Sequence, residues 1–158
     1  MVNPTPLLLA LVLLLGADCL QPQTPIIGIY TQDATNNLTY IAASYVKYLE
    51  MSGAQVVPLF YKSSQAVLNK TLQQINGVLF PGGDQAINIK NNWTKNAEFI
   101  LEFAKQQNDN GKVFPVWGTC LGHELLSYLT ANFDDKMLEG VTDEAPKVNS
   151  IQVLKRDS

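Results

Sequence analysis

One cysteine stands between two glycines in the string Gly-Thr-Cys-Leu-Gly at residues 118–122. The string follows an apolar run that ends at Trp117, and a helical pattern begins directly after it. A tight strand-to-helix turn exposes the side chain at its tip, and flanking glycines relieve the crowding of that turn. Unpaired N–H groups at a helix start favour a thiolate and can hold an oxyanion. We therefore predict Cys120 as a nucleophile and the Leu121 N–H as an oxyanion donor; an inert core cysteine is the alternative.

A second glycine-bearing loop, Pro-Gly-Gly-Asp at residues 81–84, follows a predicted strand at residues 77–80. Ligands of open α/β sheets bind at the carboxyl ends of the strands. Paired glycines let backbone amides approach a substrate closely, so this loop can supply a second oxyanion donor. Taken alone the loop also fits a plain turn, but two such loops at one sheet edge favour a joint site.

His123 is the only histidine in the 158 residues, so it is a candidate for the catalytic base. It lies about one helical turn after Cys120, yet it is expected to project from the side of the helix, which favours a surface or pocket-lining role. Glu124 follows at the start of the same helix, where a carboxylate is stabilised. One histidine and the one cysteine expected in the mature chain cannot furnish the usual metal-ligand sets, and no phosphate-binding loop of the Walker type is present. We expect no metal and no cofactor.

Strand patterns alternate with helical patterns over most of the chain. Short apolar, β-branched runs predict strands at residues 25–30, 55–60, 77–80 and 112–117. Apolar residues at helical spacing predict helices at residues 38–49, 64–75, 94–107 and 121–131. This alternation predicts a doubly wound α/β fold, a mostly parallel sheet with helices on both faces. We assign residues 25–133 to this domain and residues 134–158 to a divergent or poorly ordered tail, in which residues 151–154 could form an edge strand.

The amino-terminal residues differ in composition from the rest. An apolar run at residues 7–15 and small residues before a cleavage point after Cys19 predict a signal peptide at residues 1–19. The run is too short to span a membrane, and a lipidated Cys19 is the weaker alternative. Three sequons, at Asn37, Asn69 and Asn92, predict a glycosylated protein of a secretory route. Without Cys19, Cys120 is the only thiol, so no disulfide can form within the mature chain.

The overall charge argues against a nucleic-acid partner. Charged residues make up 16% of the chain, and the net charge is -3. A phosphate-binding surface needs a concentrated basic stripe, and the longest basic cluster is Lys155-Arg156.

Three stretches, at residues 40–50, 76–83 and 114–122, resemble the gamma-glutamyl hydrolase family of the class I glutamine amidotransferase-like group. The resemblance implies a flavodoxin-like fold and a secreted, lysosomal or vacuolar hydrolase that removes γ-linked glutamates from folylpoly-γ-glutamates. It implies a thioester on Cys120, an oxyanion hole made by the Gly83 and Leu121 amides, and substrate contacts at Gly82 and Glu124. A monomer and a homodimer both stay open.

The resemblance also shows two departures. The family's catalytic histidine, with an acidic partner two residues beyond it, belongs far downstream of the 158 residues. His123 stands where the family usually has an aromatic residue, so no role carries over to it. We expect impaired hydrolysis from these residues alone. The alternatives are a non-catalytic relative that binds a glutamate-bearing ligand or a partner protein, and a remnant without function.

Overall fold

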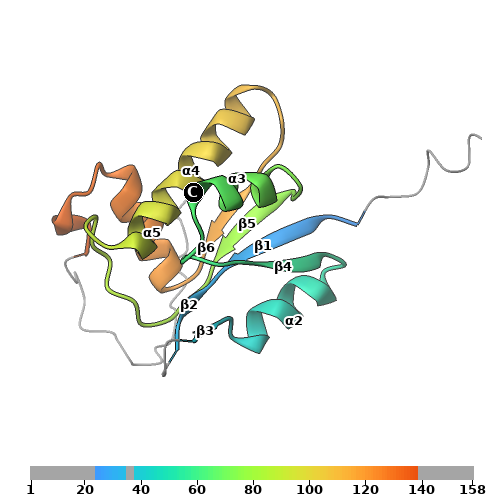
Figure 1. Ribbon diagram of the computed structural model, residues 1–158, viewed down its shortest axis with the longest axis horizontal. Coiled ribbons are helices and arrows are strands. Elements are labelled where there is room, and N and C mark those ends of the chain that lie inside the picture. The colour runs from blue at the N-terminus through green and yellow to red at the C-terminus, as the bar shows by residue number, and fades with distance from the viewer. Residues whose placement is uncertain (1–23, 35–37, 139–158) are drawn as a thin grey trace, which may run out of the picture.

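The structure is a computed structural model that describes residues 24–34 and 38–138. Over this part of the chain, parallel strands alternate with helices around one central sheet (Figure 1). The elements in chain order are β1 (Ile26–Tyr30), β2 (Gln32–Asp33), β3 (Thr39–Tyr40), α2 (Ala43–Met51), β4 (Gln55–Leu59), α3 (Gln65–Leu72), β5 (Gly77–Phe80), α4 (Asn92–Asp109), β6 (Val116–Gly118), α5 (Leu121–Thr130) and the 3-10 helix η3 (Asp135–Leu138).

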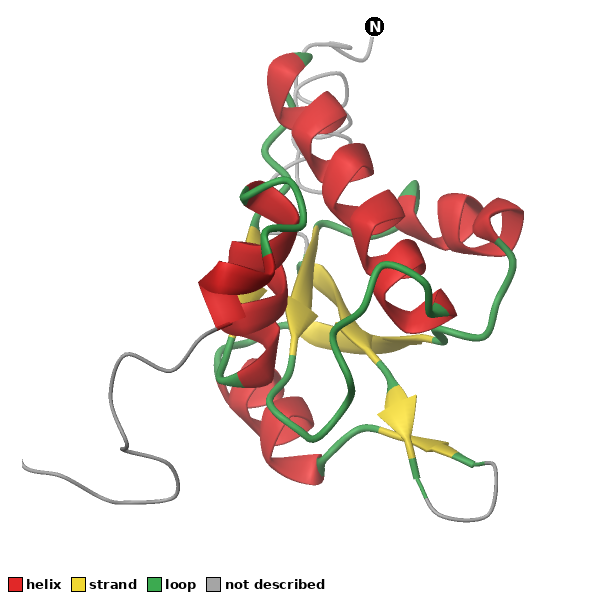
Figure 2. Ribbon diagram, turned by 90° about the vertical axis from the view of Figure 1, so that its left-hand side faces the viewer, coloured by secondary structure: helices red, strands yellow, loops and turns green. Residues whose placement is uncertain are grey.

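The central sheet has the strand order β4-β1-β5-β6, and every neighbouring pair is parallel. The chain moves from β1 outward to β4, then crosses over β1 to reach β5 and β6. Helix α2 therefore lies on one face of the sheet, while α3 and α4 lie together on the other (Figure 1). The predicted doubly wound α/β fold is confirmed. Strands β2 and β3 form a separate antiparallel ribbon that projects from the main sheet (Figure 2).

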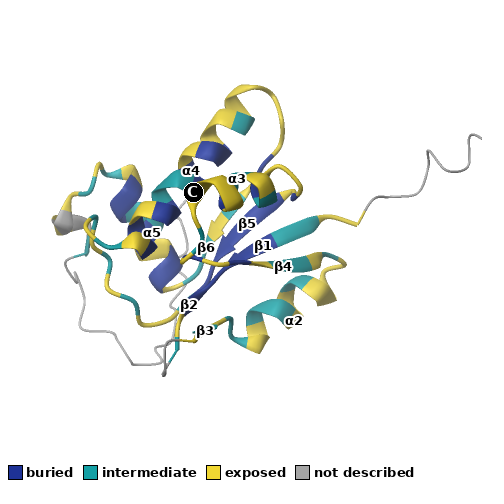
Figure 3. Cartoon of the chain, in the orientation of Figure 1, coloured by how far each residue is buried: buried dark blue, intermediate teal, exposed yellow. Residues whose placement is uncertain are grey.

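The core lies between the two central strands and the helices that cover them. Strands β1 and β5 are the most deeply buried elements, whereas α2 buries no residue fully (Figure 3). Tyr30 on β1 and Phe80 on β5 are both fully buried, with their ring centroids 5.3 Å apart in an edge-to-face arrangement. Ala97 and Ile100 on α4 are fully buried in the same cluster. This burial fixes β5, whose carboxyl end carries the loop with Gly82, and β1, whose carboxyl end leads to Gln32.

Helices α3 and α4 begin at residues that cap them. The Asn91 side chain accepts a hydrogen bond of 2.7 Å from the Thr94 N–H at the start of α4. The Ser64 hydroxyl accepts a longer one of 3.5 Å from the Val67 N–H at the start of α3. Such caps satisfy backbone donors that have no partner inside the helix.

The predicted helix at residues 38–49 begins later than expected. Thr39 and Tyr40 pair with β2 as the short strand β3, and α2 begins only at Ala43. Ala42, the residue before α2, has an extended backbone conformation with ψ at 130°, so the helix does not extend further toward the amino terminus. Leu38 is 65% exposed, so its helical spacing does not reflect a buried helix face.

The predicted strand at residues 112–117 is wrong in its first four residues, because β6 spans only Val116–Gly118. The Asn108 side chain accepts from the Phe114 N–H at 2.9 Å and donates to the Phe114 carbonyl at 3.0 Å. Pro115 has no N–H to offer to a neighbouring strand. The Phe114 and Pro115 backbones therefore donate no hydrogen bond to β5, although the Pro115 carbonyl accepts one of 3.0 Å from the Val78 N–H.

Several expectations fall on residues outside the described part, namely the signal peptide at residues 1–19, the sequon residue Asn37 and the tail beyond residue 138. The first residues of the predicted tail form η3, where Leu138 packs against the core. Among the described helices, none combines the length and apolar character needed to cross a membrane.

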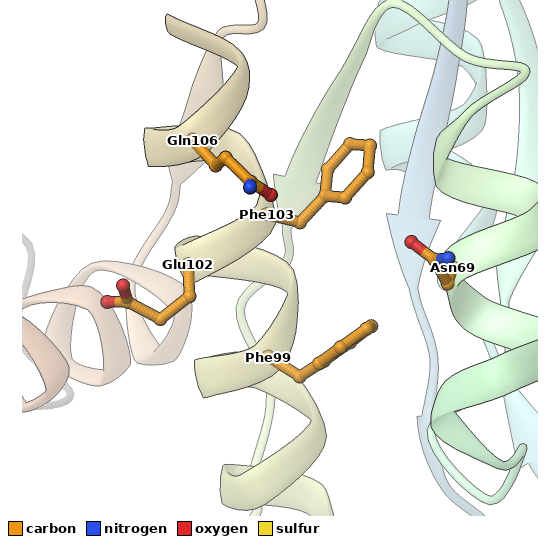
Figure 4. Close-up of a pocket in the computed structure, with 5 residues that line it drawn as sticks. All are labelled: Asn69, Phe99, Glu102, Phe103 and Gln106. Atoms are coloured by element: carbon orange, nitrogen blue, oxygen red, sulfur yellow. The ribbon is translucent and has the colours of Figure 1, made fainter. Parts of the chain in front are cut away.

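A shallow pocket of about 390 Å³ lies between α3 and α4 (Figure 4). Its wall includes Asn69 on α3 and the two aromatic rings of Phe99 and Phe103 on α4. None of the residues predicted for catalysis or substrate contact lines it.

Candidate active site

Cys120 sits in the turn between β6 and α5 with a strained backbone. Its φ is 52° and its ψ is -119°, a backbone conformation that residues other than glycine rarely adopt. Such strain costs on the order of 1–3 kcal/mol and persists only where the surrounding structure holds it. The Cys120 side chain is exposed and is not part of the apolar interior. The predicted exposure of this sulfur at a tight strand-to-helix turn is therefore what the structure shows.

The two flanking glycines let the turn close against the sheet. A β-carbon at Gly118 would lie 2.5 Å from the Gly122 carbonyl oxygen and 2.8 Å from the His123 nitrogen. A β-carbon at Gly122 would overlap the carbonyl oxygen of Phe80 on β5. Both positions therefore need glycine because backbone approaches them, and the contact to Phe80 fixes α5 against the neighbouring strand.

The loop after β5 lies directly beside the cysteine. A β-carbon at Gly82 would be 3.0 Å from the Cys120 Cβ and 2.6 Å from the Tyr45 hydroxyl oxygen. Any larger residue at position 82 would fill the space next to the sulfur. The two glycine-bearing loops thus meet at one edge of the sheet, the edge formed by the carboxyl ends of the parallel strands.

The backbone amides of Gly83 and Leu121 at this edge have no acceptor among the described residues, and neither do those of their neighbours Asp84 and Cys120. Leu121 is the first residue of α5, where N–H groups lack partners inside the helix. Gly83 is exposed at the loop after β5. Free amides in the two loops that meet beside an exposed thiol could serve as the donors that a developing oxyanion requires. By contrast, the Gly82 N–H is occupied, because it donates to the Tyr45 hydroxyl at 2.8 Å.

His123 and Glu124 both lie in the first turn of α5 and are exposed. Their backbone N–H groups donate to the Cys120 carbonyl oxygen at 2.8 Å and 3.1 Å. The His123 ring makes no hydrogen bond with any described residue. The structure therefore shows no hydrogen bond between this ring and the cysteine sulfur.

Two residues of the site were not predicted from the sequence, Gln32 and Tyr45. Gln32 follows β1 and is 2% exposed, and its Nε2 donates to the carbonyl oxygens of Pro81 and Gly82 at 3.3 Å and 3.0 Å. Tyr45 is half-buried on α2 and accepts from the Gly82 N–H. The sequence did contain one signal, because Gln32 is the second residue after the predicted strand at residues 25–30 and so belongs to the carboxyl edge of the sheet.

Charged side chains continue along this edge past β1. Lys62, which follows β4, lies 2.9 Å from the Asp33 carboxylate, and both side chains are more than 40% exposed (42% and 45%). A hydrogen bond from the Tyr61 side chain, and then one from Lys62, lower the pKa of the Asp33 carboxyl. In residues 24–34 and 38–138, no cluster of three or more His, Cys, Asp or Glu side chains could hold a metal ion.

Together, the fold and the turn define a class of protein. A parallel sheet with a strained, exposed cysteine between a strand and the helix that follows it is typical of the class I glutamine amidotransferase-like group. A family model described as Peptidase C26 matches residues 25–133, and the chain belongs to that family.

The chain is also similar to curated relatives that carry the name gamma-glutamyl hydrolase. It is 42% identical over 118 residues to gamma-glutamyl hydrolase B of Dictyostelium discoideum, covering 70% of this chain and 34% of the relative. Identity to the gamma-glutamyl hydrolases of Rattus norvegicus and Homo sapiens is 44% in both cases, over 68% and 66% of this chain and 35% of each relative. The resemblance predicted from the sequence is confirmed, and the chain spans about a third of the length of these relatives.

Proposed function

We propose that this chain carries the nucleophile of a cysteine hydrolase that cleaves γ-glutamyl bonds in folylpoly-γ-glutamates. The single observation that supports it most is the strained, exposed Cys120 between β6 and α5, with free amides at Gly83 and Leu121 beside it. The similarity to gamma-glutamyl hydrolases supports the choice of substrate.

In the proposed reaction the Cys120 sulfur attacks the carbonyl carbon of a γ-glutamyl amide. The S–C bond forms, and the oxygen becomes an oxyanion that accepts hydrogen bonds from the Gly83 and Leu121 amides. The C–N bond then breaks, and the nitrogen leaves as the amine of the released glutamate after taking up a proton. Water hydrolyses the remaining thioester and regenerates the thiol. Gly82 and Glu124 are proposed to contact the substrate beside the sulfur.

The step that limits this chain is proton transfer. No side chain among the described residues forms a hydrogen bond with the Cys120 sulfur. Protonation of the leaving amine and activation of water both depend on a positioned acid and base, which contribute about 10²–10⁴ in rate. We therefore propose that the 158 residues form the thioester slowly and release it more slowly still.

The test is to detect the thioester itself. The chain is incubated with pteroyltri-γ-glutamate, and its intact mass and the released glutamate are followed over hours. We expect either a pteroyldiglutamyl group on Cys120 with an equal amount of released glutamate, or a pteroylglutamyl group with an equal amount of released γ-glutamylglutamate, according to which γ bond is cleaved. The matched controls are Cys120→Ser and an α-linked isomer of the substrate, for which we expect neither signal.

Two other results would contradict the proposal. Binding of the substrate without any acylation of Cys120 would assign the chain to the non-catalytic, ligand-binding alternative. Equal acylation by the α-linked isomer would remove the assignment of γ-glutamyl specificity.

We also propose that the protein enters a secretory route and is glycosylated. Asn92 is exposed at the first turn of α4, and Asn69 is partly exposed on α3, so both amides can be reached from outside the fold. Expression in a secreting eukaryotic cell should give a protein whose mass falls on treatment with a peptide N-glycosidase. The variants Asn69→Gln and Asn92→Gln should each remove one glycan, and an unchanged mass in both would contradict this proposal.

A further inference from the structure

Gln32 is held at the carboxyl end of β1 by contacts to the loop that follows β5. The side chain is 2% exposed, and its Nε2 donates to the Pro81 and Gly82 carbonyl oxygens, 49 and 50 residues away in sequence. Because both partners are acceptors, they fix which end of the amide is nitrogen. Gln32 therefore has a defined orientation, with its Nε2 toward the loop carbonyls.

The hydrogen bond to the Gly82 carbonyl also sets the direction of the next amide. A trans peptide is planar, so the C=O and N–H of one peptide unit point in opposite directions. The Gly82 carbonyl points toward Gln32, and the Gly83 N–H of the same unit therefore points away from it. The Gly82 N–H is held separately by Tyr45 at 2.8 Å. Both backbone groups of Gly82 are thus held by distant side chains, while the Gly83 amide stays without an acceptor among the described residues.

The other end of the Gln32 amide is unusual. Its Oε1 is buried and, in the part of the chain that the structure describes, has no hydrogen-bond partner. A β-carbon at Gly83 would overlap this oxygen, so Gln32 also excludes any side chain at position 83. An unpaired buried acceptor costs free energy that an apolar side chain of the same shape would avoid. Core packing alone therefore does not explain a glutamine at position 32. The two hydrogen bonds that its Nε2 donates to the loop do explain it.

We propose that Gln32 is a positioning residue for the reaction, because it turns the Gly83 N–H toward the oxyanion that forms beside Cys120. This inference rests on the proposed function, and it adds the side chain that orients one of the two oxyanion donors. Tyr45 acts from the other side by holding the preceding amide. Neither side chain needs to touch the substrate in this role.

Two reactions of the same sulfur separate positioning from general stability. A γ-(p-nitrophenyl) ester of N-acetylglutamate acylates Cys120 through an oxyanion; the S–C bond forms, the C–O bond breaks and p-nitrophenolate leaves without needing a proton. Iodoacetamide alkylates the sulfur by direct displacement of iodide, and no oxyanion forms. The ratio of the acylation rate to the alkylation rate therefore reports on the oxyanion donors alone.

The variants are Gln32→Met, which keeps the length of the side chain and removes the amide, and Tyr45→Phe, which removes only the hydroxyl. Gln85→Met is the matched control, because Gln85 lies in the same loop and donates only to the Asp84 carbonyl. Loss of one oxyanion donor costs about 10²–10³ in rate, so its displacement in Gln32→Met should lower the ratio by about 10-fold or more. Tyr45→Phe should lower the ratio in the same direction, and Gln85→Met should leave it within about twofold.

The outcomes are distinct. A ratio unchanged in folded Gln32→Met and in Tyr45→Phe, with folding checked by circular dichroism, would overturn the positioning role. If Gln32→Met does not fold, the result for Tyr45→Phe decides. If the unmodified chain itself is acylated no faster than Cys120→Ala, the proposed function fails, and that result is separate from a failure of the Gln32 inference.

Discussion

Gly122 in the first turn of α5 lies against the backbone of Phe80 on β5, so closely that a β-carbon at position 122 would overlap the Phe80 carbonyl oxygen. Phe80 is itself fully buried, and its carbonyl accepts a hydrogen bond of 3.1 Å from the Thr119 N–H. The turn that presents Cys120 is therefore fixed to the neighbouring strand at two points. A change at this contact should therefore alter both the stability of the fold and the position of Cys120.

Substitution of Gly122 by alanine should destabilise the fold. The added β-carbon meets rigid backbone, and overpacking of this kind costs about 1–3 kcal/mol. Urea denaturation measures the change in the free energy of unfolding. The matched control is Ala66→Ser, which adds one atom at an exposed position of α3 and should change stability by less than about 0.5 kcal/mol. Equal stability of the two variants would show that α5 can move away from β5 without loss.

The strained backbone at Cys120 should lower the stability of the fold, because the cysteine that the proposed reaction needs adopts a conformation that favours glycine. Cys120→Gly and Cys120→Ala both remove the thiol, but only alanine keeps the β-carbon that is strained at a φ of 52°. After the larger chain entropy of unfolded glycine is subtracted, Cys120→Gly should be more stable than Cys120→Ala by about 1 kcal/mol. Thermal unfolding of the two variants checks this. A less stable glycine variant would indicate that the turn is not strained.

The loop before β6 should depend on Asn108. Its side chain makes two hydrogen bonds to the backbone of Phe114, which is 5% exposed. Asn108→Ala should cost about 1–2 kcal/mol and should speed hydrogen exchange at the Phe114 amide. Asn110→Ala is the control, since Asn110 is exposed and its side chain forms no hydrogen bond within the described residues. Unchanged exchange at Phe114 in Asn108→Ala would contradict this explanation of the short strand.

The Asp33 carboxyl should contribute a small pH-dependent stability. Its pKa is lowered in the folded chain, first by the hydrogen bond from Tyr61 and then by Lys62. A group whose folded pKa is lowered stabilises the fold above its unfolded pKa, and this contribution is lost as the pH falls through the folded pKa. The contribution is small because the pair is exposed.

An NMR titration of the Asp33 carboxyl in the unmodified chain and in Tyr61→Phe measures the shift directly. We expect the midpoint to rise toward that of an ordinary aspartate when the Tyr61 hydroxyl is removed. A midpoint that does not move would show that the Tyr61 hydrogen bond is absent in solution.

The sequence predicted the parts of the fold that depend on local patterns. The strands that became β1 and β5, the helix α4 and the turn around Cys120 follow from apolar periodicity and from glycines at a strand end. The site was predicted as two loops meeting at one edge, and the contact between Gly82 and Cys120 shows that they meet.

The features that were not predicted from the sequence depend on contacts between residues that are far apart in the sequence. Thr39 and Tyr40 are not helical, because they pair with β2. The residues directly before Val116 are not part of β6, because the side chain of Asn108 binds the backbone of Phe114. Gln32 and Tyr45 reach the glycine loop from 50 and 37 residues away. No local pattern encodes such contacts, because only the folded sheet brings these side chains together.

We propose that the fold makes the Cys120 sulfur a nucleophile toward γ-glutamyl carbonyls. The most direct measurement is acylation of the chain by the γ-(p-nitrophenyl) ester of N-acetylglutamate, in buffer and in unfolding concentrations of urea, with the modified residue mapped by mass spectrometry. We expect one acyl group on Cys120, formed at least about 10-fold faster in the folded chain, in line with the size of an oxyanion-donor effect. Equal rates in the folded and unfolded chain, or modification at another residue, would contradict it.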